Sequence, residues 1–348
     1  MKINRARHTY AHDRQAKKSR RRLLFAGLFS VILLLFCGYG VASFVKDTSM
    51  PSTETAPSQA NLAKGVQLAW PAVGQAAVGS VEDGLLARSS NNEELRPTAS
   101  MAKVITALAI MEKQPFELGQ GGQTYTVTKE DIAEMSAYIA ENGSVQPLLI
   151  GMKLTQYQAM QRMLIASDNN MADILVERIF GSKDAYVSYA QDMLKRMGLS
   201  RTVVADASGF SPATASTPSE LVAIGIAALK NPVIAEIVAQ PQAQILGLGS
   251  HGIIKNTNQL LGTDGVIGIK TGTTDKAGHC LLFAARYAAK DGKKVTIVGV
   301  IMGDTNATSL FSDSRKLLAS AKQSFGLAEA QPADNLRRRL PTWNEATR

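Results

Sequence analysis

The chain has 348 residues, 45% of them apolar, so it is long enough to bury a large core. Its net charge is +9, but nine Lys or Arg residues stand against one acid within residues 1–22, which leaves 29 basic and 28 acidic residues elsewhere. The body of the chain therefore lacks the basic excess that nucleic-acid binding requires, and we expect no nucleic-acid partner.

The N-terminal region is expected to anchor the chain in a membrane. Residues 23–45 follow the basic block without a single charge. As a helix, this run spans about 34 Å at roughly 1.5 Å per residue, which is enough for a bilayer core. The basic flank predicts that residues 1–22 stay in the cytoplasm and that the rest of the chain lies outside. A cleaved signal peptide is the alternative, and Cys37 is explained better by apolar filling of the helix than by lipidation.

Composition also defines the segments on either side of the folded part. Residues 46–63 are rich in Ser, Thr and Pro and predict a flexible linker, whereas residues 328–348 predict a disordered tail. One folded domain is expected over residues 64–327. If Cys37 lies in the membrane, Cys280 is left without a partner cysteine, so no intramolecular disulfide is expected.

The folded part is predicted to have strands at both ends and helices in the middle. Short strands are predicted at 66–70, 75–80 and 85–89, and longer, extensively buried strands at 279–285 and 295–302. Helices are predicted to begin at Ser100, after Thr155 and at Pro218, and a last one is predicted over 311–325.

These elements predict an α/β (α+β) fold. The sheet takes its strands from both ends of the domain, and a mainly helical lobe is inserted between Lys103 and Lys270. A cleft between the two lobes is the expected site.

Ser100 and Lys103 form the first of three short motifs. Ser100 is predicted at a helix start, where free NH groups and the helix dipole favour negative charge. Lys103 lies one turn further along the same face, so its amine can approach the Ser100 hydroxyl. A role as general base requires that burial or cationic neighbours lower the pKa of this lysine. The spacing is weak evidence alone, because Ser43 and Lys46 repeat it at the membrane edge.

The second motif, Ser167-Asp168-Asn169, follows an apolar helical run and is predicted to form a turn. Its serine can relay a proton between Lys103 and a leaving group, and the Asn169 amide can orient a substrate amide. A plain helix cap is the alternative, with the Ser167 side chain satisfying backbone NH groups.

The third motif, Lys270-Thr271-Gly272, is followed by Thr273 and ends an apolar strand. A lysine here can bind a carboxylate, threonine hydroxyls can add hydrogen bonds, and Gly272 lets a substrate approach the backbone. An exposed edge-strand lysine with ordinary turn residues is the alternative. The order and separation of the three motifs are typical of enzymes that acylate a serine without a histidine.

With these motifs, the chain resembles a low-molecular-mass penicillin-binding protein of the serine D-alanyl-D-alanine carboxypeptidase family. The similarity extends over about residues 65–326, with further matching segments at 96–100, 181–182, 197–199, 207–211, 258–261 and 278–281. The resemblance implies a β-lactamase/transpeptidase-like fold with an antiparallel sheet. It also implies a bacterial cell membrane location, crossed once by the N-terminal helix.

The resemblance further implies a reaction on the stem peptides of peptidoglycan. Ser100 would attack the carbonyl between two terminal D-alanines, Lys103 would take its proton, and Ser167 would pass a proton to the departing D-alanine. The oxyanion would lie between the backbone NH groups of Ser100 and Thr273, and water would release the acyl-enzyme. β-Lactam antibiotics would acylate the same serine, and no cofactor is expected.

The implied substrate-binding residues come from two of the motifs. Lys270 and Thr273 would hold the terminal carboxylate, and Asn169, Thr271 and Gly272 would complete the binding set. A metal site is not expected, because the histidines of the exported part are far apart in sequence and lack metal-ligand spacing.

Other functions on this fold remain open. A D,D-endopeptidase would cut cross-linked stem peptides, a transpeptidase would replace water by an amine, and a β-lactam or wall-peptide sensor would turn nothing over. Ser-Asp-Asn is the triplet of class A β-lactamases, whereas the family often has Gly at Asp168. Those β-lactamases need a deacylating glutamate. Between Asn169 and Pro218 the sequence offers only Glu177, so this function is disfavoured.

Overall fold

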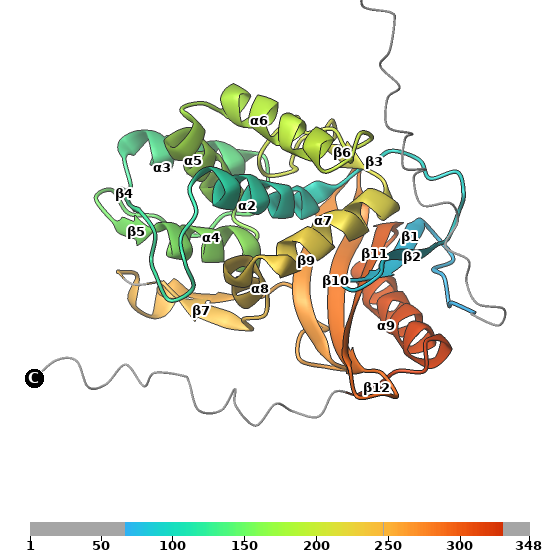
Figure 1. The fold of residues 1–348 in the computed structure, drawn as a ribbon. Helices are drawn as coiled ribbons and strands as arrows, with labels where there is room; N and C mark the ends of the chain where they lie inside the picture. Colours follow the sequence, from blue (N-terminus) through green and yellow to red (C-terminus); the bar gives the residue numbers. More distant parts are fainter. Residues whose placement is uncertain (1–66, 246, 330–348) are drawn as a thin grey trace, which may run out of the picture. The chain divides into compact units, whose positions relative to one another are not determined.

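The computed structural model describes residues 67–245 and 247–329, and the main element of this part is an antiparallel sheet of six strands. The strand order is β12-β10-β11-β1-β2, and β9 pairs with β10 beside β12 (Figure 1). The strands are β1 (Gln75–Ser80), β2 (Gly84–Arg88), β9 (Val266–Thr274), β10 (Gly278–Ala288), β11 (Lys294–Asp304) and β12 (Ala328–Glu329). The prediction that strands from both ends of the domain share one antiparallel sheet is confirmed.

Helices cover both faces of this sheet. α9 (Ala307–Ser324) packs on one face and α7 (Pro218–Lys230) on the other (Figure 1). Side chains alternate along a strand, and in β10 Leu282 joins the core that contains α7, whereas Phe283 joins the core that contains α9. Because apolar residues face both ways, a one-residue shift in strand pairing would disrupt two cores at once, and the register is strongly fixed.

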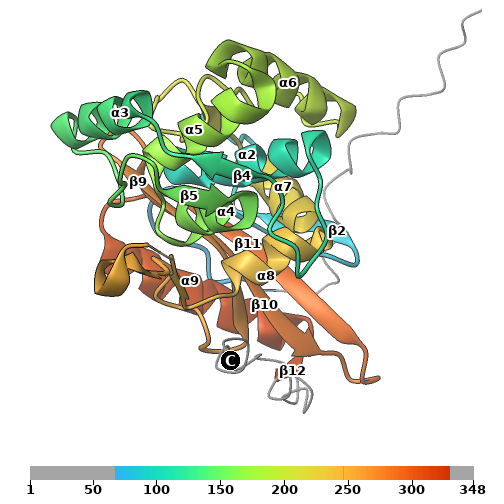
Figure 2. The same cartoon turned by 90° about the vertical axis from the view of Figure 1, so that its left-hand side faces the viewer.

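The other helices form a mainly helical region beside the sheet (Figure 2). They are α2 (Ala102–Lys113), α3 (Lys129–Ala140), α4 (Gln156–Ile165), α5 (Asn169–Phe180), α6 (Lys183–Arg196) and α8 (Pro232–Val238). α2 contacts α4, α5, α6 and α7, so it lies in the middle of this region. The inserted helical lobe predicted from the sequence is therefore present.

Short elements complete the described part. Two-stranded sheets pair β3 (Arg96–Pro97) with β6 (Ala215–Ser216), β4 (Thr124–Thr126) with β5 (Lys153–Thr155), and β7 (Gln242–Gln244) with β8 (Ile253–Lys255). Two 3-10 turns are η1 (Ala99–Met101) and η2 (Gly249–Gly252). The β3–β6 pair ties the segment that enters η1 to the segment that precedes α7.

Local capping signals set several helix boundaries, and the starts of α4 and α7 are as predicted. Thr155 and Gln158 form a reciprocal capping box at the start of α4. Thr217 caps α7 by accepting a hydrogen bond from the backbone NH of Glu220, with Pro218 in the first turn. Gly181 ends α5 in the left-handed conformation, at a φ of 86°.

Other sequence-based boundaries are wrong, for identifiable reasons. Residues 67–70 form no strand, because the backbone NH groups of Gln67 and Ala69 donate instead to serine hydroxyls of α9. α9 begins at Ala307 rather than at residue 311, since the Asn306 side chain caps it by accepting from a backbone NH. Ser100 lies in η1, which runs directly into α2 at Ala102.

The two ends of the predicted domain differ in what the structure describes. Ala328 and Glu329 form β12 against β10, so the predicted tail does not begin at residue 328. The basic segment 1–22, the membrane helix 23–45 and the linker 46–63 lie outside the described residues. In the described ranges no single helix has the length and apolar character to cross a membrane, although α7 and α8 together pass that test while bent by 105°.

Candidate active site

Ser100 lies in a strained turn that close packing holds in place. Ala99 of η1 has a φ of 46°, a left-handed conformation that is costly for a residue with a Cβ atom. Gly209 packs directly on this turn, and a Cβ atom there would lie 1.9 Å from the Ala99 carbonyl oxygen. The packing against a glycine therefore fixes the half-buried Ser100 at the entrance to α2.

Lys103, in the first turn of α2, is fully buried beside Ser100. Its Nζ donates hydrogen bonds to Ser100 Oγ at 2.8 Å, to Asn169 Oδ1 at 2.7 Å and to the Ser208 carbonyl oxygen at 2.8 Å. Burial lowers the pKa of Lys103 from 10.5 to about 7, although nearby carboxylates, Asp206 foremost, oppose the shift. An amine with this pKa can release its proton near neutral pH and accept another from a hydroxyl.

The turn that carries Ser167 is held by a buried ion pair. Ser167 has a φ of 62°, and Asp168 stands at the N-cap of α5. Arg162 of α4 donates from Nε to Asp168 Oδ2 at 2.9 Å, and both side chains are fully buried. The same guanidinium donates to the carbonyl oxygens of Gln146 and Pro147, each at 2.9 Å. Directional charged hydrogen bonds thus fix a turn whose backbone would otherwise be unfavourable.

β9 carries the third motif to the same place. Lys270 is 1% exposed, and its Nζ donates to the Thr271 carbonyl oxygen at 3.0 Å. Burial, and then the charge of Lys103, lower the pKa of Lys270 well below its usual value. Gly272 lies against η1, and a Cβ atom there would come within 3.0 Å of the Ser100 backbone nitrogen. A larger residue would push the strand away from the serine.

The two threonines of this strand have different surroundings. Thr271 Oγ1 shares a hydrogen bond of 2.5 Å with Thr257 Oγ1. Thr273 is exposed and pairs across the sheet with His279 of β10, whose Nδ1 lies 3.1 Å from Thr273 Oγ1. The histidine therefore orients an exposed hydroxyl that a ligand can reach.

The structure brings residues of the three motifs into contact with one another. Direct contacts join Ser100 to Lys103 and Lys103 to Asn169, and Gly272 lies against the Ser100 backbone. The Asn169 amide, which the sequence predicts to orient a substrate amide, uses its oxygen to accept from Lys103 Nζ. The Ser167 side chain is buried, and its predicted proton relay stays a prediction.

Three residues of the site have no role in the sequence-based prediction. Ser208 contributes only its carbonyl oxygen, which no side-chain pattern can reveal. Asp206 holds the turn that presents this carbonyl, and the sequence marks only the adjoining segment 207–211, through the family resemblance. The strand predicted over 279–285 gives His279 no role of its own, and its place opposite Thr273 follows only from the β9–β10 register.

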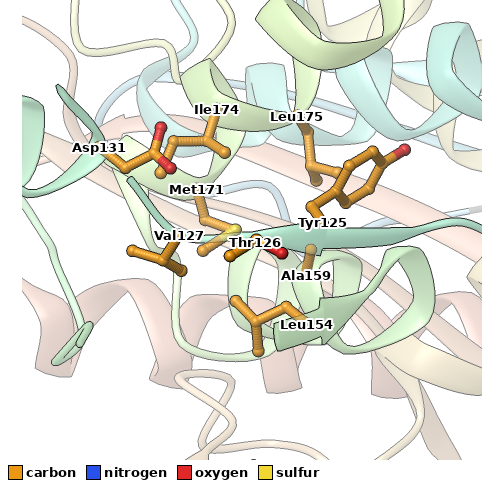
Figure 3. A pocket seen from close by; sticks show the side chains of 9 residues that line it. All are labelled: Tyr125, Thr126, Val127, Asp131, Leu154, Ala159, Met171, Ile174 and Leu175. Carbon is orange, nitrogen blue, oxygen red and sulfur yellow. The ribbon is translucent and has the colours of Figure 1, made fainter. Parts of the chain in front are cut away.

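Two hollows lie near these residues. One, of about 10 Å³, lies between the paired strands β4 and β5 and the helices α3, α4 and α5, and its lining is mainly apolar (Figure 3). It contains none of the motif residues and is a packing gap no larger than one water. The other, of about 330 Å³, is open and lies beside the site, lined by Glu134, Ala137, Tyr138, Glu141, Asp173, Lys183, Asp206, Phe210 and Ser211.

Comparisons of the sequence with known proteins agree with this geometry. Residues 76–306 match the model of the peptidase S11 family, described as D-alanyl-D-alanine carboxypeptidase. A D-alanyl-D-alanine carboxypeptidase of Streptomyces sp. (strain K15) is 27% identical over 238 residues, which cover 64% of this chain and 78% of that protein. A D-alanyl-D-alanine endopeptidase of Pseudomonas aeruginosa is 24% identical over 256 residues, covering 72% and 76% of the two chains.

Solved structures show the same fold. The Streptomyces K15 DD-transpeptidase aligns with a TM-score of 0.63 at 23% identity, covering 74% of this chain and 98% of that one. The D-alanyl-D-alanine carboxypeptidase of Mycobacterium tuberculosis H37Rv aligns with a TM-score of 0.63 at 25% identity, covering 75% and 95%. The chain therefore belongs to the S11 peptidase family of D-alanyl-D-alanine carboxypeptidases, and it is a serine hydrolase with the fold of the penicillin-binding D,D-peptidases.

Proposed function

We propose that this protein is a membrane-anchored serine D,D-carboxypeptidase that removes the terminal D-alanine from peptidoglycan stem pentapeptides. The observation that carries the proposal is the pair of Ser100 Oγ and Lys103 Nζ at 2.8 Å, with a fully buried amine whose pKa is about 7. A neutral Lys103 would take the Ser100 proton as the oxygen attacks the carbonyl between the two D-alanines. The product of this step is an acyl-enzyme on Ser100.

The close approach of β9 to η1 supports the predicted oxyanion site. Gly272 lies against the Ser100 backbone nitrogen, so the NH groups of Ser100 and Thr273 come from adjoining segments. Two NH groups fixed before the reaction would stabilise the negative oxygen of the tetrahedral intermediate. Ser167, whose turn is held rigidly, would return the proton to the leaving D-alanine nitrogen, and water would then hydrolyse the acyl-enzyme.

The carboxylate end of the substrate would lie along β9. Within the described residues, β9 pairs with no strand other than β10, so an extended peptide backbone would be able to pair with its other edge. Lys270 and the exposed Thr273 hydroxyl would bind the terminal carboxylate, and Asn169 and Thr271 would border the substrate. Penicillin, which carries a carboxylate beside a reactive amide, would acylate Ser100 in the same way.

A D,D-endopeptidase is the second candidate, and a specific observation favours it. The Pseudomonas aeruginosa relative is named a D-alanyl-D-alanine endopeptidase and covers 72% of this chain. Such an enzyme would use the same serine and lysine on a cross-linked stem peptide. Its leaving group would be the third residue of a neighbouring stem peptide instead of a free D-alanine.

One experiment separates these functions. Full-length protein in detergent is incubated with a stem pentapeptide and with a cross-linked dimer, and the products are weighed by mass spectrometry. Loss of one D-alanine from the pentapeptide, with the dimer intact, supports the carboxypeptidase, and cleavage of the dimer alone supports the endopeptidase. The Ser100→Ala variant is the control, and covalent labelling of this variant by penicillin would contradict the assignment of the nucleophile.

The proposed anchor rests on the uncharged run at residues 23–45 behind nine basic residues. We expect full-length protein to stay in the membrane pellet after alkaline extraction, with residues 1–22 protected on the cytoplasmic side. A shortened protein in the soluble fraction would support signal-peptide cleavage instead.

A further inference from the structure

The carboxylate of Asp206 organises the turn that reaches Lys103. Its Oδ2 accepts hydrogen bonds from Ser208 Oγ at 2.9 Å, from the Phe210 backbone NH at 2.8 Å and from the Ser211 backbone NH at 3.2 Å. Its Oδ1 accepts from the Thr214 hydroxyl. One side chain therefore closes the segment between α6 and β6, which contains no regular secondary structure.

This turn touches the catalytic segment at successive residues. The Ala207 carbonyl oxygen accepts from Thr106 Oγ1 of α2 at 2.6 Å, and the Ser208 carbonyl oxygen accepts from Lys103 Nζ at 2.8 Å. The next residue, Gly209, packs against the strained Ala99. A shift of the turn would thus move the Ser208 carbonyl oxygen away from Lys103 and Gly209 away from Ala99 at the same time.

Asp206 also differs from the other carboxylates near Lys103 in the groups that surround it. Three carboxylates oppose the lowered pKa of Lys103, in the order Asp206, Asp168 and Asp173. Asp168 is paired with a buried arginine, and Asp173 lies 2.8 Å from the ammonium of Lys183.

In the described ranges no ion pair includes Asp206, whose four hydrogen-bond donors are all neutral. A charge without a cationic partner acts over a longer range than one inside an ion pair. Of the groups facing Lys103, which also include the cation Lys270 on β9, Asp206 therefore exerts the least compensated field.

We propose that Asp206 is a positioning residue of the site, which holds the Ser208 carbonyl oxygen against Lys103 and keeps a negative charge near this amine. The inference rests on the proposed role of Lys103 as the base. The sign follows from charge: Asp206 favours the ammonium form, so it keeps the pKa of Lys103 from falling further below its value of about 7. Activity needs neutral Lys103 and so rises with pH through this value.

The test measures the rate of covalent acylation by labelled penicillin against pH, with full-length protein in detergent. The Asp206→Asn variant retains the shape of the side chain and an acceptor oxygen but removes the charge. We expect the acidic limb of its pH–rate profile to move to lower pH. The shift should be about half a unit, because solvent screens the charge of a partly exposed carboxylate. The Asp206→Glu variant retains the charge but displaces the acceptor oxygens, so its limb should stay in place while its plateau falls about tenfold.

The Asp184→Asn variant is the matched control, since Asp184 lies exposed on α6 and does not contribute to the Lys103 shift. Its profile should coincide with that of the unchanged protein. An Asp206→Asn limb at the original pH would overturn the proposal, and so would an Asp206→Glu plateau at the original height. Thermal unfolding shows whether each variant folds. If one does not, the other variant alone decides the test. Failure of the unchanged protein to acylate at any pH would instead overturn the proposed function itself.

Discussion

The helical region and the sheet each bury one lysine at the site, and they surround these lysines in opposite ways. Lys103 on α2 donates to three acceptors and lies within the field of three carboxylates. Among the described residues, Lys270 on β9 donates only to a backbone carbonyl, and the charge that perturbs its pKa is that of Lys103. The lysine of the helical region is thus equipped to exchange a proton with Ser100.

Lys270, the buried lysine of the sheet, has no anionic partner among the described residues. An ammonium ion out of water is costly unless an anion is placed beside it. In the part of the chain that the structure describes, no carboxylate pairs with Lys270. In the proposed function, the carboxylate of a ligand would supply this anion and would raise the pKa of Lys270 on binding. The two lysines would then serve different purposes because of what surrounds them.

Replacing the lysine of the helical region should have the largest effect. In the Lys103→Met variant we expect acylation by labelled penicillin and release of D-alanine both to fall by about 10³-fold, the usual contribution of a general base. Lys113→Met, in the last turn of the same helix and exposed, is the control and should retain full activity. Equal losses in both variants would show that the effect belongs to the helix rather than to the amine.

The ion pair below Ser167 should rank next, because it fixes the helical side of the site before any ligand binds. Asp168→Asn leaves the buried Arg162 without its anion, and the free energy of unfolding should fall by about 3 kcal/mol. Chemical denaturation measures this loss. Asp192→Asn, which breaks the exposed pair with Lys195 on α6, should leave stability unchanged. A stable Asp168→Asn protein would show that packing alone holds the turn.

Replacing the lysine of the sheet should weaken substrate recognition rather than proton transfer. In Lys270→Met we expect kcat/KM for a pentapeptide to fall about 100-fold, as when one partner of a buried charge pair is removed. A pentapeptide with a C-terminal amide sharpens the test, because the unchanged protein should lose activity on it whereas the variant should handle acid and amide alike. If the variant still prefers the acid, a residue other than Lys270 binds the carboxylate.

The sequence predicts the local parts of this site well. Ser100 and Lys103 lie one helical turn apart, so their contact follows from spacing, and Thr155 with Gln158 marks the start of α4 by capping chemistry. β10 could be predicted because its apolar residues fill both faces. Each of these signals is contained within a few neighbouring residues.

Contacts between distant segments could not be predicted in this way. The Ser208 carbonyl oxygen meets Lys103 across 105 positions, and a backbone atom leaves no mark in the side-chain pattern. The Arg162–Asp168 pair spans only six positions, yet its burial depends on how α4 and α5 pack. The strand expected near residue 68 failed because its NH groups found partners on α9, 251 and 257 positions away.

The smallest expected effect comes from the residue that orients Thr273. Replacing His279 by Phe retains a ring on β10 but removes the nitrogen 3.1 Å from the Thr273 hydroxyl. We expect kcat/KM to fall about fivefold, the value of one ordinary hydrogen bond, with kcat little changed. Penicillin acylation and D-alanine release should fall in parallel, since both ligands present a carboxylate to this strand.

Thr273→Val should lower kcat/KM at least as much, and the double variant should be no worse than Thr273→Val alone, because the histidine acts through the threonine. Additive losses would mean that His279 contacts the carboxylate itself, and the sheet would then supply a further carboxylate-binding residue beside Lys270.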